Sequence, residues 1–176
     1  MKILMVHNFY GSAAPSGENM VFEAEKSLLQ KNGHDVAVFT RQSDEIRNNG
    51  FAGMLRGAIA TPWNWRMGAA IKKVMEDFKP DVVHVHNTFP LISPAIFYAI
   101  GNRAASVFTL HNYRLFCPAA IPLRNGRVCT LCIENKTVWP SLKYGCYRKS
   151  RLATLPLAVS VALHRMLDTW TKQCLL

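Results

Sequence analysis

Short apolar runs alternate with amphipathic stretches over the first part of the chain. Residues 2–7 (KILMVH) form an apolar run that stops at polar residues and a loop of small residues, which predicts a buried strand. Residues 18–31 place apolar side chains at helical spacing and close on an Asn-Gly pair, a typical helix end. Residues 35–40 (DVAVFT) predict a second strand, so the chain begins with a βαβ unit whose strands run parallel.

The same alternation continues to residue 110. We expect an irregular connection with one short helix over residues 41–65, a helix over 66–78, a strand over 82–86, a short helix over 93–100 and a strand over 105–110. Helices that alternate with buried strands predict the α/β class, here a Rossmann-like open parallel sheet with helices on both faces. Residues 1–110 would form this core.

The character of the chain changes after residue 110. Residues 111–150 contain four Cys and show little hydrophobic periodicity, so we interpret them as an irregular insertion of the same domain that something must hold in shape. Residues 151–176 complete the domain, with a helix predicted over 151–171. Its apolar side carries Leu152, Leu155, Val159, Ala162, Leu163, Met166 and Trp170. Its basic start favours an interfacial helix, and a helix packed in the core is the alternative.

Length and charge narrow the class of protein. The 176 residues, 49% of them hydrophobic, suffice for one domain and exclude a disordered chain. The apolar runs are too short for a membrane span or a signal peptide, so we expect a cytoplasmic protein. Residues 102–176 hold 11 basic and 2 acidic residues and thus most of the net charge of +10. A basic segment of this kind typically binds phosphates, which belong to nucleic acid, lipid headgroups or a sugar nucleotide. The alternative is a solvated basic surface without a phosphate partner.

Three His-Asn pairs stand where predicted strands end. The pairs are His7-Asn8, His86-Asn87 and His111-Asn112. Because the carboxyl ends of parallel strands lie at one edge of a sheet, we expect the pairs to converge on one cleft. Neutral imidazole and amide groups there suit hydroxyl recognition and a proton relay. His84 projects to the same face as His86 and is interpreted as a core histidine.

The loop after the first strand is a second candidate site. Ser16 and Gly17 precede the predicted helix, where free backbone amides and the helix dipole favour an anionic ligand. Glu18 stands in the first turn. The loop matches neither GxGxxG nor a P-loop, and a plain turn is the alternative.

Four cysteines form the third candidate site. Cys129 and Cys132 make a CxxC pair, and Cys117 and Cys146 lie 12 and 14 positions to either side. Four thiolates around one tetrahedral Zn²⁺ would hold the irregular segment in shape. Free buried thiols, disulfides and an iron–sulfur cluster are the alternatives.

These segments together resemble a known family. Taken in order, they are MKILMVHNFY, PSGENMVFEAEKSLLQKNGHDVAVFT, FKPDVVHVHNTFPLISPAIF and SVFTLHNYRLFCP. They resemble the N-terminal half of family-4 retaining glycosyltransferases of the two-Rossmann-domain (GT-B) architecture. The similarity covers nearly the whole chain and includes the Cys-bearing insertion LRNGRVCTLC, which a bacterial subset of that family carries.

The resemblance implies roles for several residues. Residues 16–18 take the place of a family loop that approaches the sugar-nucleotide phosphates and the acceptor, with Ser16 where relatives have a first Gly. His111 matches a histidine that faces the transferred sugar, which makes it the candidate catalytic residue. Asn112 follows where relatives carry Asn or Asp, and Asn87 would lie on the acceptor side of the cleft.

The family's second Rossmann domain, which binds most of the nucleotide-sugar donor, has no counterpart in the sequence. The resemblance therefore implies a truncated, acceptor-binding half of a glycosyltransferase, inactive without a donor-binding domain or subunit. Its acceptor would be a glycan or a lipid-linked sugar, reached from the inner membrane face. A zinc-bearing basic module for nucleic acid and a non-catalytic membrane-surface fragment are the alternatives. Nucleic acid is the weaker partner because the basic residues are scattered and no aromatic platform accompanies them.

Overall fold

The computed structural model describes residues 1–11 and 16–172. Residues 12–15 of the predicted loop and Cys174 lie outside the described residues. The chain divides into two compact units. The first comprises residues 1–111 and the chain from Trp170 onward, and the second comprises residues 112–169.

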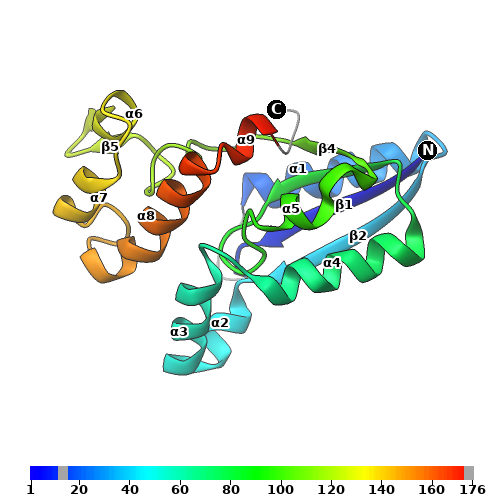
Figure 1. The fold of residues 1–176 in the computed structure, drawn as a ribbon, viewed down its shortest axis with the longest axis horizontal. Coiled ribbons are helices and arrows are strands. Elements are labelled where there is room, and N and C mark those ends of the chain that lie inside the picture. The colour runs from blue at the N-terminus through cyan, green and yellow to red at the C-terminus, as the bar shows by residue number, and fades with distance from the viewer. Residues whose placement is uncertain (12–15, 173–176) are drawn as a thin grey trace. The chain divides into compact units, whose positions relative to one another are not determined.

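A four-stranded parallel sheet forms the core of the first unit, in the order β2-β1-β3-β4 (Figure 1). Its strands are β1 (Lys2–Phe9), β2 (Asp35–Gln42), β3 (Val82–Asn87) and β4 (Ala105–Phe108). This topology confirms the predicted α/β, Rossmann-like class. From β1 the chain passes to β2 on one side and later to β3 on the other. The topological switch point therefore lies between the carboxyl ends of β1 and β3.

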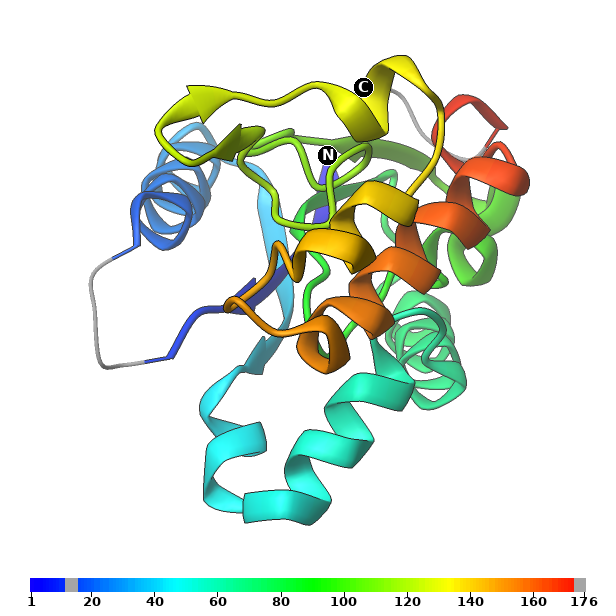
Figure 2. The ribbon, with the colours of Figure 1, turned by 90° about the vertical axis from the view of Figure 1, so that its left-hand side faces the viewer.

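Helices cover both faces of this sheet. α1 (Gly17–Lys31) lies on one face, and α4 (Trp65–Phe78) and α5 (Ile96–Ile100) lie on the other (Figure 2). A 3₁₀ turn, Gly101–Arg103, leads from α5 to β4. On the α1 side, Ile3, Met5 and Phe22 make a core cluster, against which Phe9, Leu29 and Val36 pack. Because strand side chains alternate between faces, these residues fix which side of β1 α1 covers.

Two helices occupy the stretch over residues 41–65 that the glycine-rich sequence predicted to be irregular with one short helix. They are α2 (Asp44–Asn48) and α3 (Gly50–Ala60), which pack against each other. A Cβ on Gly53 would lie 2.2 Å from the backbone oxygen of Ile46, and one on Gly57 would lie 2.8 Å from Ile46 Cδ1. Both glycines therefore permit close helix packing and do not break α3.

The second unit combines short elements with one long helix. An antiparallel pair, β5 (Leu123–Arg124) and β6 (Arg127–Val128), is followed by α6 (Leu131–Glu134), α7 (Trp139–Tyr144) and α8 (Arg151–Met166). α8 packs on α7. Near its end, Arg165 donates hydrogen bonds to the carbonyl groups of Phe116 at 3.2 Å and Cys132 at 3.5 Å. The long helix thus holds the Cys-bearing segment of the same unit.

The helix predicted over residues 151–171 ends at Met166 and buries a different side. Asp168 adopts a left-handed backbone with φ of 51°, which separates α8 from the short α9 (Thr169–Lys172). The buried residues of α8 are Thr154, Leu157, Ala158, Val161 and His164. Most of the predicted apolar side is open instead, with Leu152 83% and Met166 74% exposed, while Leu163 and Trp170 are half-buried. Within residues 1–11 and 16–172, no helix combines the length and the apolar character needed to cross a membrane.

Replacing Gly53 by Ala tests the close approach of α2 and α3. We expect Gly53→Ala to lower the free energy of unfolding by about 1–3 kcal/mol, because the methyl group would strike the backbone oxygen of Ile46. Gly68→Ala in α4 is the matched control. Its Cβ would meet Ala99 Cβ at an ordinary 3.7 Å, so the gain in helix propensity should leave stability unchanged or raised. Urea unfolding followed by circular dichroism measures both, and equal stability of the two variants would contradict the packing described.

Candidate functional site

Four histidines gather toward the carboxyl edge of the sheet, on the face that α1 covers. They are His7 in β1, His84 and His86 in β3, and His111 after β4, and we call them the histidine row. The ring centroids of His84 and His86 lie 4.3 Å apart, those of His86 and His111 5.4 Å, and those of His7 and His86 6.2 Å. The structure thus brings together the three strand-end histidines and adds His84 to them.

Helix α1 closes this face of the histidine row. Phe22 stacks on the His7 ring at 4.8 Å and meets the His86 ring edge to face at 5.3 Å. One turn earlier, Asn19 Oδ1 lies 2.9 Å from His7 Nε2. One turn later, Glu25 Oε2 lies 3.2 Å from His86 Nε2. The three helix residues are three positions apart and therefore share one face of α1.

Burial keeps three members of the histidine row, His7, His84 and His86, uncharged at neutral pH. Removal from water lowers the pKa of His86 to about 3, and the neighbouring histidines add to this effect. Burial also lowers the pKa of His7 and of His84, although the Asn19 hydrogen bond opposes it at His7 and the Glu25 carboxylate opposes it at His84. A neutral imidazole offers one N–H donor and one acceptor, which suits contact with substrate hydroxyl groups.

The two histidines of β3 have further polar neighbours. His84 Nε2 lies 2.7 Å from Thr109 Oγ1, and His86 Nδ1 lies 3.2 Å from His111 Nε2. His86 is buried, whereas His111 is half-buried. The contact between them joins the interior of the row to its more accessible end, an arrangement that can pass a proton between rings.

Two of the three asparagines in the His-Asn pairs are bonded to other parts of the chain. Asn87 Nδ2 donates to the Asn8 carbonyl group at 2.9 Å, and its Oδ1 accepts from the Phe89 N–H at 2.9 Å. Asn8 Nδ2 donates to Ser43 Oγ at 2.9 Å. Both side chains are buried. Asn87, expected on the acceptor side of the cleft, here links the ends of β1 and β3.

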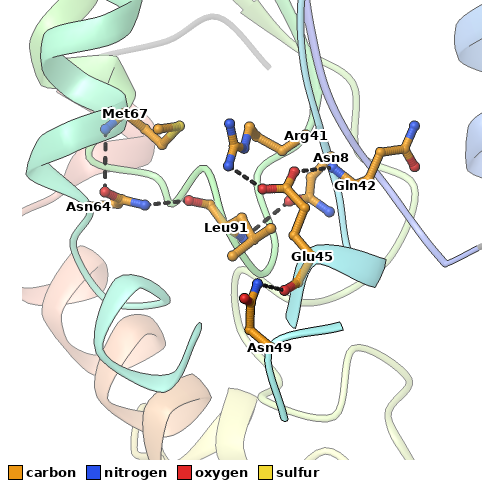
Figure 3. Close-up of polar contacts among 8 residues, drawn as sticks. All are labelled: Asn8, Arg41, Gln42, Glu45, Asn49, Asn64, Met67 and Leu91. Atoms are coloured by element: carbon orange, nitrogen blue, oxygen red, sulfur yellow. Dashed lines mark hydrogen bonds and ion pairs between the residues drawn. The ribbon is translucent and has the colours of Figure 1, made fainter. Parts of the chain in front are cut away.

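Figure 3 shows how the loop after β3 is held in place. Asn8 Oδ1 accepts from the Leu91 N–H at 3.1 Å, and Asn64 Nδ2 donates to the Leu91 carbonyl group at 2.5 Å. Asn64 Oδ1 also caps α4 by accepting from the Met67 N–H at 3.3 Å.

A second group around α2 contains Arg41, Gln42, Glu45 and Asn49. Neither group was predicted from the sequence. For the first group the available signal was Asn64, because an Asn directly before a helix often caps it.

The loop residues Ser16, Gly17 and Glu18 stand at the start of α1, as predicted. Ser16 is the residue before the helix and has an extended backbone, and Glu18 lies in the first turn. Gly17 is exposed, and a Cβ there would meet nothing within 4 Å. The Glu18 carboxylate acts on His7 by opposing the fall of its pKa. This end of α1 therefore lies beside the His7 end of the histidine row.

Asn112 and the four cysteines belong to the second unit. Asn112 Oδ1 accepts from the Arg114 N–H at 3.0 Å and so forms a turn at the start of the unit. The thiols of Cys117, Cys129, Cys132 and Cys146 are free, and all four residues line one pocket. Burial raises the pKa of the first, third and fourth of these thiols, and the charges of neighbouring cysteines add to the rise.

Comparison with protein families decides the kind of protein. The model of Glycosyltransferase Family 4 matches residues 17–168. The chain belongs to glycosyltransferase family 4. No curated protein and no solved structure matches it. The matched part of this family-4 chain begins with α1 and contains three residues of the histidine row and the four cysteines. The resemblance drawn from the sequence segments is thus confirmed at the level of the family.

Buried, neutral His86 should make this family-4 protein less stable in acid. The pKa of a histidine is about 6.5 in the unfolded chain, whereas that of folded His86 is about 3. Between these two pH values the unfolded state binds a proton that the folded state does not, so a fall in pH favours unfolding. The stabilisation by neutral His86 is complete above pH 6.5. As the pH falls from 6.5 toward 3, this one residue lowers the free energy of unfolding by about 1.4 kcal/mol per pH unit. Urea unfolding at pH 7, 6 and 5 measures the free energy of unfolding. This free energy should fall less steeply with decreasing pH in His86→Gln than in the wild type. Parallel pH dependences would contradict a neutral, buried His86.

Proposed function

We propose that this chain is the acceptor-binding half of a glycosyltransferase that transfers a sugar from a nucleotide-sugar donor to a glycan or lipid-linked acceptor. The observation that carries the proposal is the meeting of His7, His86 and His111 beside the switch point between β1 and β3. Ligands of open parallel α/β sheets bind at this place. Membership of family 4 supports the class of reaction.

Within this proposal His111 is the residue that meets the transferred sugar. Its Nε2 is engaged by His86 Nδ1 at 3.2 Å, so a substrate hydroxyl would meet Nδ1. The loop at Ser16 and Gly17 would approach the donor phosphates, because it stands at the start of α1 and the backbone amides at a helix N-terminus carry partial positive charge. The reaction needs stabilisation of the departing diphosphate by such groups, and no residue of this chain is assigned as a covalent nucleophile.

The proposal includes a partner for the donor. Glycosyltransferases with two Rossmann domains divide their substrates between the domains, and the sheet described here would serve the acceptor. A second Rossmann domain or a separate subunit would hold the nucleotide of the donor. Without it, this chain should not turn over a nucleotide sugar.

The open face of α8 supports a lipid-linked acceptor at a membrane surface. Leu152 is 83% exposed, and Leu155 and Val159 on the same side of the helix are 47% and 45% exposed. Arg148 and Lys149, just before the helix, are exposed as well. A helix with an apolar side and a basic start binds anionic headgroups. A membrane surface is therefore preferred to nucleic acid as the phosphate-bearing partner, and cytoplasmic placement on its inner face is part of the proposal.

Binding of a lipid-linked sugar tests the role of His111. The probe is a polyprenyl-diphosphate-linked sugar in phosphatidylglycerol vesicles, and empty vesicles give the background. We expect His111→Ala to weaken binding about tenfold, because the variant loses a hydrogen-bonding group from a half-buried site. His34→Ala is the matched control, since His34 precedes β2 at the opposite edge of the sheet.

The same preparations are assayed for release of nucleotide from UDP-, GDP- and dTDP-sugars. We expect the chain alone to release none above background. Equal probe binding by the two variants would overturn the role of His111. Robust turnover by the chain alone would overturn its assignment as the acceptor half.

We also propose that the four cysteines hold a structural Zn²⁺ ion. They come from the loop before β5, the residue after β6, α6 and the chain after α7, and they line one pocket. Burial raises the pKa of the Cys117 and Cys132 thiols, and hydrogen bonds from the backbone amides of Ala119 and Ala120 to Cys117 and of Ser141 to Cys132 oppose this rise. Such N–H donors favour the thiolate that zinc requires. A metal would join short elements that have little core of their own.

Zinc removal should unfold the second unit and spare the first. We expect a chelator at neutral pH to abolish hydrogen-exchange protection over residues 112–166 and to leave β1 and β3 protected. The variant Cys129→Ser/Cys132→Ser should reproduce this loss and lower the zinc content, whereas Cys174→Ser, a change at a cysteine that is not one of the four, should not. Unchanged protection and unchanged zinc content in the double variant would rule out the ion.

A further inference from the structure

A second group of metal-ligating side chains lies between α1 and β3, in the first unit. Glu25, His84 and His86 each offer one ligand atom, and these atoms all lie within 4.8 Å of one another. The carboxylate oxygen is 3.7 Å from His84 Nδ1 and 3.2 Å from His86 Nε2. The two histidines are two positions apart in β3 and so project to the same face, opposite α1.

The ring nitrogens on the far side of each histidine already have neighbours. His84 Nε2 lies 2.7 Å from Thr109 Oγ1, and His86 Nδ1 lies 3.2 Å from His111 Nε2. In metal sites a ligating imidazole binds the ion through one nitrogen and donates a hydrogen bond from the other to a fixed partner. Both histidines show this arrangement, and in both the nitrogen left for an ion is the one nearest Glu25.

We propose that Glu25, His84 and His86 bind a divalent transition-metal ion of the zinc class. Two imidazoles and one carboxylate are a common zinc donor set, which leaves the fourth position for water or another ligand. The side chains of Glu25 and His84 are 36% and 17% exposed, so an ion can enter from solvent. The His86 side chain is fully buried and would provide the fixed end of the site.

An ion here would decide which nitrogen of each ring carries the proton. With the metal on His86 Nε2, the proton stays on His86 Nδ1 and is donated to His111 Nε2. His111 must then carry its own proton on Nδ1. The ion would thus set the hydrogen-bonding atoms that His111 presents, although metal binding itself requires neither a donor sugar nor an acceptor.

Titration with Co²⁺ distinguishes this site from the cysteine pocket. Cobalt bound by thiolates gives a strong charge-transfer band in the near ultraviolet, whereas cobalt held only by nitrogen and oxygen gives visible ligand-field bands without it. We expect the metal-free wild type to bind one Co²⁺ per chain that lacks the thiolate band, whatever the second unit binds.

Glu25→Gln keeps the shape of the side chain and removes its charge. We expect this variant, and His84→Gln, to weaken binding of the Co²⁺ without the thiolate band by about tenfold or more. Glu23→Gln, on an exposed position of the same helix, is the matched control and should bind as the wild type does. Circular dichroism melting shows whether each variant is folded.

Two results would overturn the proposal. One is Glu25→Gln binding cobalt as the wild type does, and the other is a thiolate band for all the cobalt bound. The three side chains would then form a hydrogen-bonded network only. Neither result bears on acceptor binding, which the vesicle experiment measures separately.

Discussion

Phe22 packs against the rings of His7 and His86 and thereby holds α1 on the face of β1 and β3. This contact shuts water away from the imidazoles, and burial then lowers their pKa and keeps them neutral. The helical spacing places Asn19 and Glu25 one turn to either side of Phe22, against the same two histidines. The chemistry of the histidine row therefore depends on one helix–sheet contact.

The edge of the sheet is shaped by a second constraint, the need to satisfy buried polar groups where the strands end. Asn8 and Asn87 meet it by bonding to backbone groups of β1 and of the loop after β3. Asn64 then ties Leu91 of that loop to the start of α4. Buried amides that are fully bonded rigidify the segments they join. The histidines can thus face a ligand from a fixed edge, as the proposed function requires.

The parallel sheet could be predicted because its strands are short apolar runs ended by polar residues, and the strand-end histidines located its carboxyl edge. Contacts between distant residues could not be predicted. Gly53 resembles a helix breaker until its packing on Ile46 is known. The bonds of Asn87 to the backbone of Asn8 and Phe89 cannot be read from the sequence. Glu25 is one of several acidic residues on an amphipathic helix, and only the packing of α1 on β3 brings it to the histidines.

Nitrogen-15 NMR of the imidazole side chains tests the central claim most directly, since it reports the protonation and tautomer of each ring. We expect His86 to stay neutral, in a single tautomer, as the pH falls from about 7.5 to about 5.5, and His7 and His84 to take up a proton at a lower pH than a free imidazole does. Protonation of His86 with a pKa near 6.5 would contradict the account, because that ring would then be open to water and not sealed under α1.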